Sequence, residues 1–138
     1  MEKWQINNMN IGDKLPELHL KPITREALSL YASASGDHNP IHTDIGFAKK
    51  SGLNDVIAHG MLIMGYLGIA LTDYINQENI KEYGVIFSSI TNIGDLLRCN
   101  GVITEIKKID NHKHFRIELE VLDQNNDNKL TGYSIIEF

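Results

Sequence analysis

The sequence has 138 residues, a length that suits one domain, and we expect residues 1–138 to form a single domain with a substantial core. Its 13 basic and 18 acidic residues give a net charge of −5, which argues against nucleic acid or an anionic membrane as the main partner. The single cysteine, Cys99, excludes an intrachain disulfide and fits the reducing environment of the cytoplasm.

The first helix is predicted over residues 24–35, because apolar side chains recur there at helical spacing. Thr24 is a suitable N-cap, and Gly36 suits the position after the helix, where a left-handed residue is common. The turn Gly-Asp-His-Asn-Pro follows. Pro40 disfavours a helical conformation at Asn39, so we expect the chain to leave this turn extended.

Two more helices are expected in the middle of the chain. A short one is predicted over residues 44–51 and is ended by Gly52. A longer one is predicted over residues 60–75, and its first three turns have no polar face. A helix that is apolar all round is buried on all sides, so we expect a sheet wrapped around it and a partner covering the rest. Gly65 and Gly68 each cost about 1 kcal/mol relative to alanine inside a helix, and we expect a neighbouring element to pack closely there.

The rest of the chain is predicted to form β-strands. Apolar and charged side chains alternate in one segment, the pattern of a half-buried strand, and polar turn signals separate the runs. The expected strands cover residues 82–90, 95–106, 115–121 and 129–138. Residues 15–21 lie between prolines, so we expect an edge position at best. One long buried helix followed by antiparallel strands indicates an α+β fold.

Asp37 and His42 lie in the turn after the first helix, and we interpret them as an acid–base pair. A rigid bend could bring the carboxylate and the imidazole into one pocket, and imidazole titrates near neutral pH. On these residues alone, a structural role in the turn is as well supported. Gly60 begins the long helix, where free backbone N–H groups suit a substrate carbonyl oxygen. A metal site that adds His38 to this pair is the main alternative. Because Pro40 breaks the helix that would place both histidines on one face, we predict no metal.

Two stretches of the chain together resemble one known family. They are Ser-Gly-Asp-His-Asn-Pro-Ile-His at residues 35–42 and Ile-Ala-His-Gly-Met-Leu at residues 57–62. They closely resemble the MaoC-like, (R)-specific enoyl-thioester hydratases and 3-hydroxyacyl-thioester dehydratases, and the resemblance runs from about residue 11 to the last strand. It implies a hotdog fold, in which an antiparallel sheet wraps around one long buried helix. It also implies that Asp37 and His42 are catalytic, and that the substrate-binding residues are Gly60, Asn39 and His59.

The resemblance further implies a reaction. A hydro-lyase of fatty-acid metabolism would reversibly hydrate a trans-2-enoyl thioester to a (3R)-3-hydroxyacyl thioester, without any cofactor. The acyl group would be carried by coenzyme A or acyl carrier protein, and the carrier, chain length and pathway stay open. Two alternatives remain, a hotdog acyl-CoA thioesterase and a non-catalytic acyl-binding or scaffold subunit of a heterodimeric dehydratase.

The expected partner and location follow from the same resemblance and from the apolar pattern. The family implies a homodimer, and heterodimers occur in some lineages. The first eight residues have no apolar leader core, and the most apolar run, residues 61–71, is far short of the roughly 20 residues that a membrane span needs. We therefore expect a cytoplasmic protein with neither a membrane nor a nucleic acid as partner.

Overall fold

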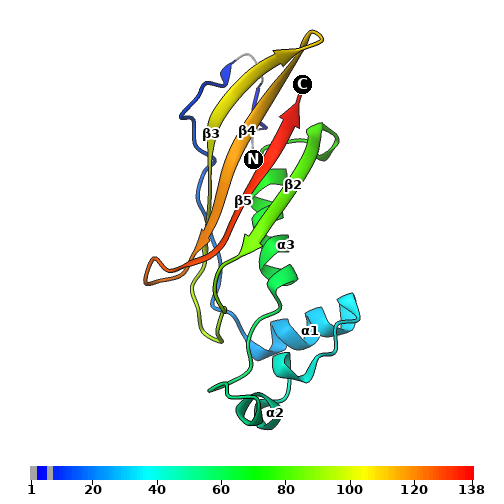
Figure 1. Cartoon of the computed structure of the whole chain (residues 1–138), viewed down its shortest axis with the longest axis vertical. Helices are drawn as coiled ribbons and strands as arrows, with labels where there is room; N and C mark the ends of the chain where they lie inside the picture. The colour runs from blue at the N-terminus through cyan, green and yellow to red at the C-terminus, as the bar shows by residue number, and fades with distance from the viewer. Residues whose placement is uncertain (1–2, 6–7) are drawn as a thin grey trace.

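The computed structural model describes residues 3–5 and 8–138. The expectation about a leader rests partly on residues 1, 2, 6 and 7, which lie outside the described ranges. The main layer is a five-stranded antiparallel sheet in the order β1-β3-β4-β5-β2 (Figure 1). Its strands are β1 (Leu18–His19), β2 (Ile80–Phe87), β3 (Arg98–Ile109), β4 (His112–Leu122) and β5 (Asn128–Glu137). The expected antiparallel sheet is confirmed, with the short β1 at one edge.

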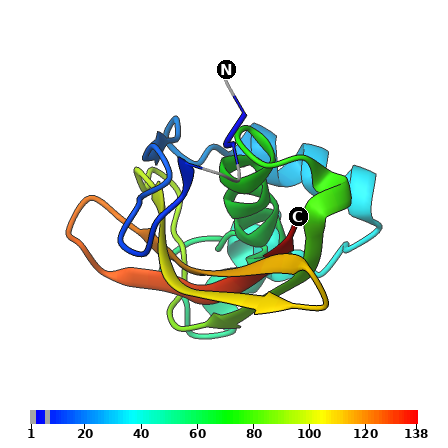
Figure 2. The same ribbon diagram turned by 90° about the horizontal axis from the view of Figure 1, so that it is seen from above.

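The alternation in β4 gives the sheet one buried and one open face. Phe115 and Ile117 are buried against the core, whereas Arg116 and Glu118 lie on the other face, where Arg116 Nε donates to Glu118 Oε1 at 2.7 Å. Register shifts interrupt three strand pairs, β2–β5, β3–β4 and β4–β5. Such bulges bend a strand and increase its twist. The sheet therefore curls, and Figure 2 shows it curving past the long helix.

The helix α3 (Gly60–Thr72) lies against the concave face of the sheet (Figure 2). Ile63 and Leu67 are buried between the helix and the sheet. The opposite face is open in the protomer, where Met61 is 56% and Ile69 46% exposed. The sheet thus covers one side of the helix, as expected, and leaves the other side uncovered. None of the helices within residues 3–5 and 8–138 combines the length and apolarity that crossing a membrane requires.

The sheet does not supply the close packing expected at the helix glycines in the case of Gly65. A side-chain carbon placed at Gly65 would meet no atom within 4 Å, whereas one at Gly68 would lie 3.7 Å from the Tyr83 ring. Gly65 is exposed and belongs to the open face of α3, so the sheet does not reach it. Both glycines line a surface groove of about 430 Å³ together with Ile69 and Tyr83.

The short 3-10 turn η3 (Gln77–Asn79) joins α3 to β2. The other helices pack at one end of the sheet, below α3 in Figure 1. They are α1 (Arg25–Ser35), the 3-10 turn η2 (Pro40–His42) and α2 (Ile45–Lys50). The Thr24 side chain caps α1, and Gly36 follows it in the left-handed region at φ 78°. Both expectations for this helix are therefore confirmed, and they fix where the next turn begins.

The prediction that the chain leaves the Gly-Asp-His-Asn-Pro turn in an extended conformation is wrong. Asn39 adopts the non-helical conformation that a following proline favours, with φ −57° and ψ 121°. The chain then makes one 3-10 turn, because the fixed φ of proline suits the first helical position. The Asn39 side-chain oxygen also accepts the Ile41 N–H at 3.2 Å, which caps the turn. The tighter path carries His42 back toward the chain before α3.

The connection between β2 and β3 is longer than predicted. β2 ends at Phe87 and β3 begins at Arg98, so residues 88–97 form a loop where strand was expected at both ends. Asp95 explains part of the difference, because its buried carboxylate accepts the Asn92 N–H at 2.8 Å and folds the chain back on itself. Cys99 follows in β3 and is fully buried. Burial, with a smaller effect of Glu17, raises the pKa of its thiol to about 12, in keeping with a core residue.

Candidate active site

Asp37, His42 and His59 come together from three separate segments. Asp37 follows α1, His42 ends η2, and His59 is the residue before α3. One carboxylate oxygen of Asp37 and one ring nitrogen of each histidine lie within 4.8 Å of one another. Asp37 is exposed, whereas His42 and His59 are buried. The result is a surface carboxylate beside two buried imidazoles.

His42 is held in one tautomer by the backbone. Its Nδ1 lies 2.7 Å from the carbonyl oxygen of Ile57, and a carbonyl only accepts, so Nδ1 carries the proton. The other ring nitrogen, Nε2, is therefore the basic one in the neutral ring. The contact also fixes the ring plane. A histidine fixed in this way can take up or release a proton at a defined point.

In the turn that carries Asp37, side chains of the turn accept hydrogen bonds from the backbone N–H groups of the same turn. The Asp37 N–H donates to Ser35 Oγ at 3.1 Å, and Asp37 Oδ1 accepts the Asn39 N–H at 3.2 Å. The second oxygen of Asp37 is left free of such turn contacts. The side-chain oxygen of Asn39 accepts the Ile41 N–H, so it is bonded to the backbone of the next turn. The structure thus gives Asn39 a bracing contact.

His59 lies between two aromatic rings. It stacks on His42 with ring centroids 3.7 Å apart and planes 24° apart, and it meets Tyr31 edge-on at 4.8 Å. Its Nε2 donates to the Asp37 carbonyl oxygen at 3.2 Å, and its buried Nδ1 has no partner among the described residues. His59 therefore contacts both Asp37 and His42 from inside the protein. Its side chain is only 1% exposed, so it reaches the surface only through these neighbours.

The burial of His59 should make the fold sensitive to mild acid. Burial lowers the pKa of His59, a hydrogen bond to Asp37 opposes the shift, and the nearby His42 adds to it. The unfolded chain then binds a proton that the folded chain excludes, so stability present above the ordinary pKa of about 6.5 is lost as the pH falls below it. In urea unfolding, wild type should lose more stability between about pH 7.5 and about pH 5.5 than the His59→Gln variant. An equal loss in the two proteins would show that His59 does not contribute.

Gly60 begins α3 beside His42. The side chain of the residue before it, His59, makes no cap to the helix. In the first turn the Leu62 N–H donates to the His59 carbonyl oxygen at 3.2 Å, and the Gly60 N–H is a donor without a partner among the described residues. Gly60 and His42 both line a cavity of about 360 Å³, called here the His42 cavity. Its lining is completed by Ile57, Ala58, Ile63, Phe87, Ser88, Ser89, Ile90, Thr91 and Leu130. A ligand in this cavity can therefore meet an imidazole and a helix N-terminus at once.

The absence of a side chain at Gly60 has a local reason. A side-chain carbon there would lie 2.8 Å from the Phe87 ring, which is closer than such atoms approach. Phe87 lies at the end of β2, and its ring lines the same cavity next to the start of α3. Glycine thus lets the Phe87 ring pack against the backbone at the start of α3.

The paired imidazoles suit acid–base chemistry better than metal binding. The lone pairs of a histidine lie in the ring plane, and the planes of His42 and His59 are nearly parallel and stacked. Their lone pairs therefore lie in two nearly parallel planes, which does not suit convergence on one ion in a tetrahedral site. His38, which the sequence-based metal hypothesis included, is exposed and is absent from the cluster with Asp37.

The sequence signals and the geometry overlap only in part. Asp37, His42 and the start of α3 were singled out from the sequence, and they lie together. Two features were given no role in the site by the sequence analysis, the ring of Tyr31 against His59 and the cavity wall formed by Phe87–Thr91. The wall belongs to a short polar stretch after a strand, a pattern that is equally typical of an ordinary surface loop.

Comparisons with known proteins agree with this picture. The family model described as MaoC like domain matches residues 7–125. A peroxisomal hydratase-dehydrogenase-epimerase of Neurospora crassa is 35% identical over 97 residues, which are 70% of this chain and 10% of that protein. The 3-hydroxyacyl-thioester dehydratase Z of Mycobacterium tuberculosis is 26% identical over 106 residues, covering 72% of this chain and 70% of the relative.

A solved structure has the same fold. The R-hydratase PhaJ1 of Pseudomonas aeruginosa superimposes with a TM-score of 0.82 at 24% sequence identity, covering 94% of this chain and 82% of that one. This likeness confirms the hotdog fold, an antiparallel sheet curled around one long helix. The chain spans about a tenth of the length of the Neurospora relative, so the two correspond over one segment only. Because the family model matches most of the sequence, the chain belongs to the MaoC-like dehydratase domain family.

Proposed function

We propose that this protein reversibly hydrates trans-2-enoyl thioesters to (3R)-3-hydroxyacyl thioesters, with residues 1–138 acting as one hotdog domain. The carrier of the acyl group would be coenzyme A or acyl carrier protein. The observation that carries the proposal is the His42 cavity, which has an imidazole and a free helix N-terminus on its lining. A hydratase needs these two elements together, a group that moves a proton and a donor for the thioester oxygen.

His42 and Asp37 would move the elements of water. In dehydration, Nε2 of His42 takes the proton from the carbon beside the thioester, because Nδ1 is committed to the Ile57 carbonyl. Asp37 holds the hydroxyl on the next carbon and assists its departure as water. In hydration the path reverses, and the hydroxyl adds to the third carbon while the proton returns to the second. Their nitrogen and oxygen atoms lie within 4.8 Å of each other, a span that one water or hydroxyl can bridge.

Gly60 would stabilise the charge that develops during this step. Removing the proton turns the thioester carbonyl into an enolate, and the negative charge collects on its oxygen. The N–H of Gly60 and the positive end of the α3 dipole both favour that charge. A side chain at this position would collide with the Phe87 ring, so glycine is needed for α3 to begin beside this wall of the cavity.

The two rival functions differ from this one in what they need. A hotdog thioesterase would release a free thiol, and a scaffold subunit would turn over nothing. The pairing of an exposed carboxylate with a tautomer-fixed histidine supports a proton-transfer enzyme over a scaffold. A thioesterase would need a water activated for attack on the thioester carbonyl carbon, and this pairing of Asp37 with His42 does not by itself indicate such a water.

The test is hydration of crotonyl-CoA, followed by loss of the enoyl absorbance, with chiral analysis of the product. We expect 3-hydroxybutyryl-CoA of (3R) configuration and no free thiol. Release of thiol without hydration would support the thioesterase instead. No turnover of the CoA substrate or of its acyl-carrier-protein form would support the scaffold subunit.

We further propose that two copies of this chain associate through β2 and the open face of α3. Within the described part of the chain, β2 pairs only with β5, so its other edge offers free backbone groups. Ile86 on this strand is 73% exposed, and Met61 and Ile69 add apolar surface on the helix. An unpaired edge next to an apolar patch is the kind of surface that a second chain covers.

Gly65 provides a test of this association. It lies in the open groove of α3, where a side chain meets nothing in the protomer, so the Gly65→Trp variant should fold normally. In sedimentation velocity we expect wild type to be a dimer and this variant to be a monomer. The Lys108→Trp variant, near the β3–β4 hairpin tip, is the control and should remain dimeric. A monomeric wild type at micromolar concentration, or a dimeric Gly65→Trp variant, would reject this interface.

A further inference from the structure

The wall of the His42 cavity opposite the helix is made by a loop. Phe87 at the end of β2 and the loop residues 88–91 supply five adjacent lining positions. This stretch has no regular secondary structure after Phe87, apart from one isolated bridge near its end. Its position therefore depends on contacts from elsewhere in the fold. The start of the loop is tied to β5 by the Ser88 N–H, which donates to the Lys129 carbonyl oxygen at 2.9 Å, and by Ser89 Oγ, which donates to the Asn128 carbonyl oxygen at 2.8 Å.

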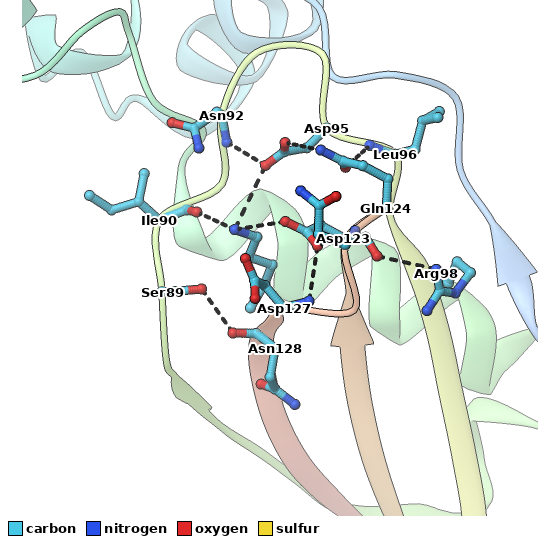
Figure 3. Close-up of polar contacts among 12 residues, drawn as sticks. Ser89, Ile90, Asn92, Asp95, Leu96, Arg98, Asp123, Gln124, Asp127 and Asn128 are labelled. Atoms are coloured by element: carbon cyan, nitrogen blue, oxygen red, sulfur yellow. Dashed lines mark hydrogen bonds and ion pairs between the residues drawn. The ribbon is translucent and has the colours of Figure 1, made fainter.

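The Lys129 side chain holds the next part of the loop. This side chain is only 5% exposed, although lysine is rarely buried without a partner. Nζ donates to the Ile90 carbonyl oxygen at 2.7 Å and lies 3.3 Å from Asp123 Oδ2 and 3.9 Å from Asp95 Oδ2. Figure 3 shows Ile90, Asp95 and Asp123 converging from the loop and from the hairpin between β4 and β5. One cation thus joins two points of the loop to the sheet.

The two carboxylates are themselves held in place. Asp95 Oδ2 accepts the Asn92 N–H at 2.8 Å, and its Oδ1 accepts from Gln124 Nε2 at 3.2 Å. Asp123 Oδ1 accepts the N–H groups of two hairpin residues, Asn125 at 2.8 Å and Asp127 at 3.0 Å (Figure 3). Burial opposes ionisation of Asp123, but these amides and Lys129 outweigh it and lower its pKa. Asp123 is therefore held as a carboxylate 3.3 Å from Lys129 Nζ.

Such a network is a costly way to gain stability. Removing charges from water carries a penalty that their attraction only partly offsets, and apolar residues of similar volume are often as stabilising. An apolar side chain at position 129 could fill the space, but it could not fix the direction of the Ile90 carbonyl. The distinctive effect of Lys129 is therefore the placement of the loop backbone.

The same loop is tied to the catalytic side of the cavity. The Thr91 carbonyl oxygen accepts the Ala58 N–H at 2.9 Å, and Asn92 forms a bridge with Ile57. Ile57 is the residue whose carbonyl holds His42. The contacts from Lys129 to His42 thus run along one short path, through Ile90 and Thr91 and then through the segment before α3.

We propose that Lys129 is a positioning residue of the reaction, which sets the distance between the Phe87–Thr91 wall and the His42–Gly60 side of the cavity. This role rests on the proposed hydratase function. Lys129 touches no reacting atom. It holds the surface against which the acyl group lies, so its loss weakens substrate binding while the proton-moving groups stay in place.

The test compares two variants that loosen the same hairpin from opposite sides. Lys129→Met removes the donor to Ile90 and keeps a chain of similar length. Arg98→Met removes the donors to the Asp123 carbonyl oxygen, 3.2 Å away, and to Asn126 Oδ1 in the same hairpin, together with the ion pair to Glu17. Arg98 does not line the His42 cavity. For Lys129→Met we expect the KM for crotonyl-CoA to rise about tenfold or more with kcat within about threefold of wild type. For Arg98→Met we expect a KM close to wild type. Both variants should unfold at a lower urea concentration than wild type, because each loses contacts in the hairpin.

A merely structural role would give another result. A smaller folded fraction lowers the apparent kcat and leaves KM unchanged, so that pattern, or an equal rise of KM in both variants, would overturn the proposal. Amide hydrogen exchange adds a second measurement, and residues 88–92 should exchange faster in Lys129→Met than in Arg98→Met. If Lys129→Met does not fold, Asp95→Asn is the second variant, because it weakens the contact between Asp95 and Lys129. Asp95→Asn should also raise KM, and an unchanged KM in that variant would overturn the proposal. Wild-type hydration is measured first, because its absence would reject the proposed function and not the role of Lys129 alone.

Discussion

Replacing His42 with alanine should lower the kcat of enoyl-thioester hydration by about 10²–10⁴-fold, the usual contribution of a general acid–base group. The backbone holds Nδ1 of His42, and the opposite nitrogen is the one that can exchange a proton with substrate. Alanine removes that nitrogen but leaves the Gly60 donor and the cavity wall unchanged. KM should therefore change much less than kcat. The measurement is steady-state hydration of crotonyl-CoA with purified variants.

The neighbouring histidine provides the control for this prediction. His38 lies in the same turn but is exposed and outside the cluster, so His38→Ala should retain nearly full activity. If His42→Ala kept more than about a tenth of the wild-type kcat, general acid–base catalysis by His42 would be ruled out. Equal losses in the two variants would point to damage to the turn rather than to a lost proton carrier.

The second large effect concerns stability, and Leu67→Ala should lower the free energy of unfolding by about 2–5 kcal/mol. Leu67 is fully buried where α3 meets the concave face of the sheet, so alanine would leave a cavity that the curled sheet cannot easily close. The helix also carries Gly60 at its start. A looser helix should therefore reduce activity at temperatures well below the unfolding midpoint. Urea unfolding followed by circular dichroism gives the stability.

Ile69 is the matched control on the same helix. It lies on the open face and is 46% exposed, so Ile69→Ala should cost less than about 1 kcal/mol in the monomer. If two copies pack over this face, the cost should grow with protein concentration, because association stabilises the folded state. Similar losses for Leu67→Ala and Ile69→Ala in dilute protein would contradict the observed placement of the helix.

Local rules predicted the pieces of this fold well. Thr24, Gly36 and Gly52 mark helix ends because each satisfies a requirement of the backbone alone. The alternation over residues 115–121 likewise decides which face of β4 is buried. The start of α3 at Gly60 is as predicted, because the apolar run leaves no other place for it.

What the sequence could not give are features that depend on distant neighbours. A lysine after a polar hairpin is usually exposed, and nothing near Lys129 in the chain indicates that Ile90 and Asp95 will enclose it. The stacking of His59 on His42 has the same origin, since the two lie on different elements. The turn after Pro40 was mispredicted for a local reason, because proline both ends a helix and favours the first position of the next one.

Phe87 belongs to two surfaces at once, since it lines the His42 cavity and ends the strand with the unpaired edge. If a second chain covers that edge, ligand in the cavity and partner on the edge act on the same ring. Their binding free energies are then coupled, and the coupling is reciprocal. Whatever factor the dimer adds to ligand affinity, saturating ligand must add to the association constant. Under the proposed function, dilution alone would therefore alter how tightly the protein holds a thioester.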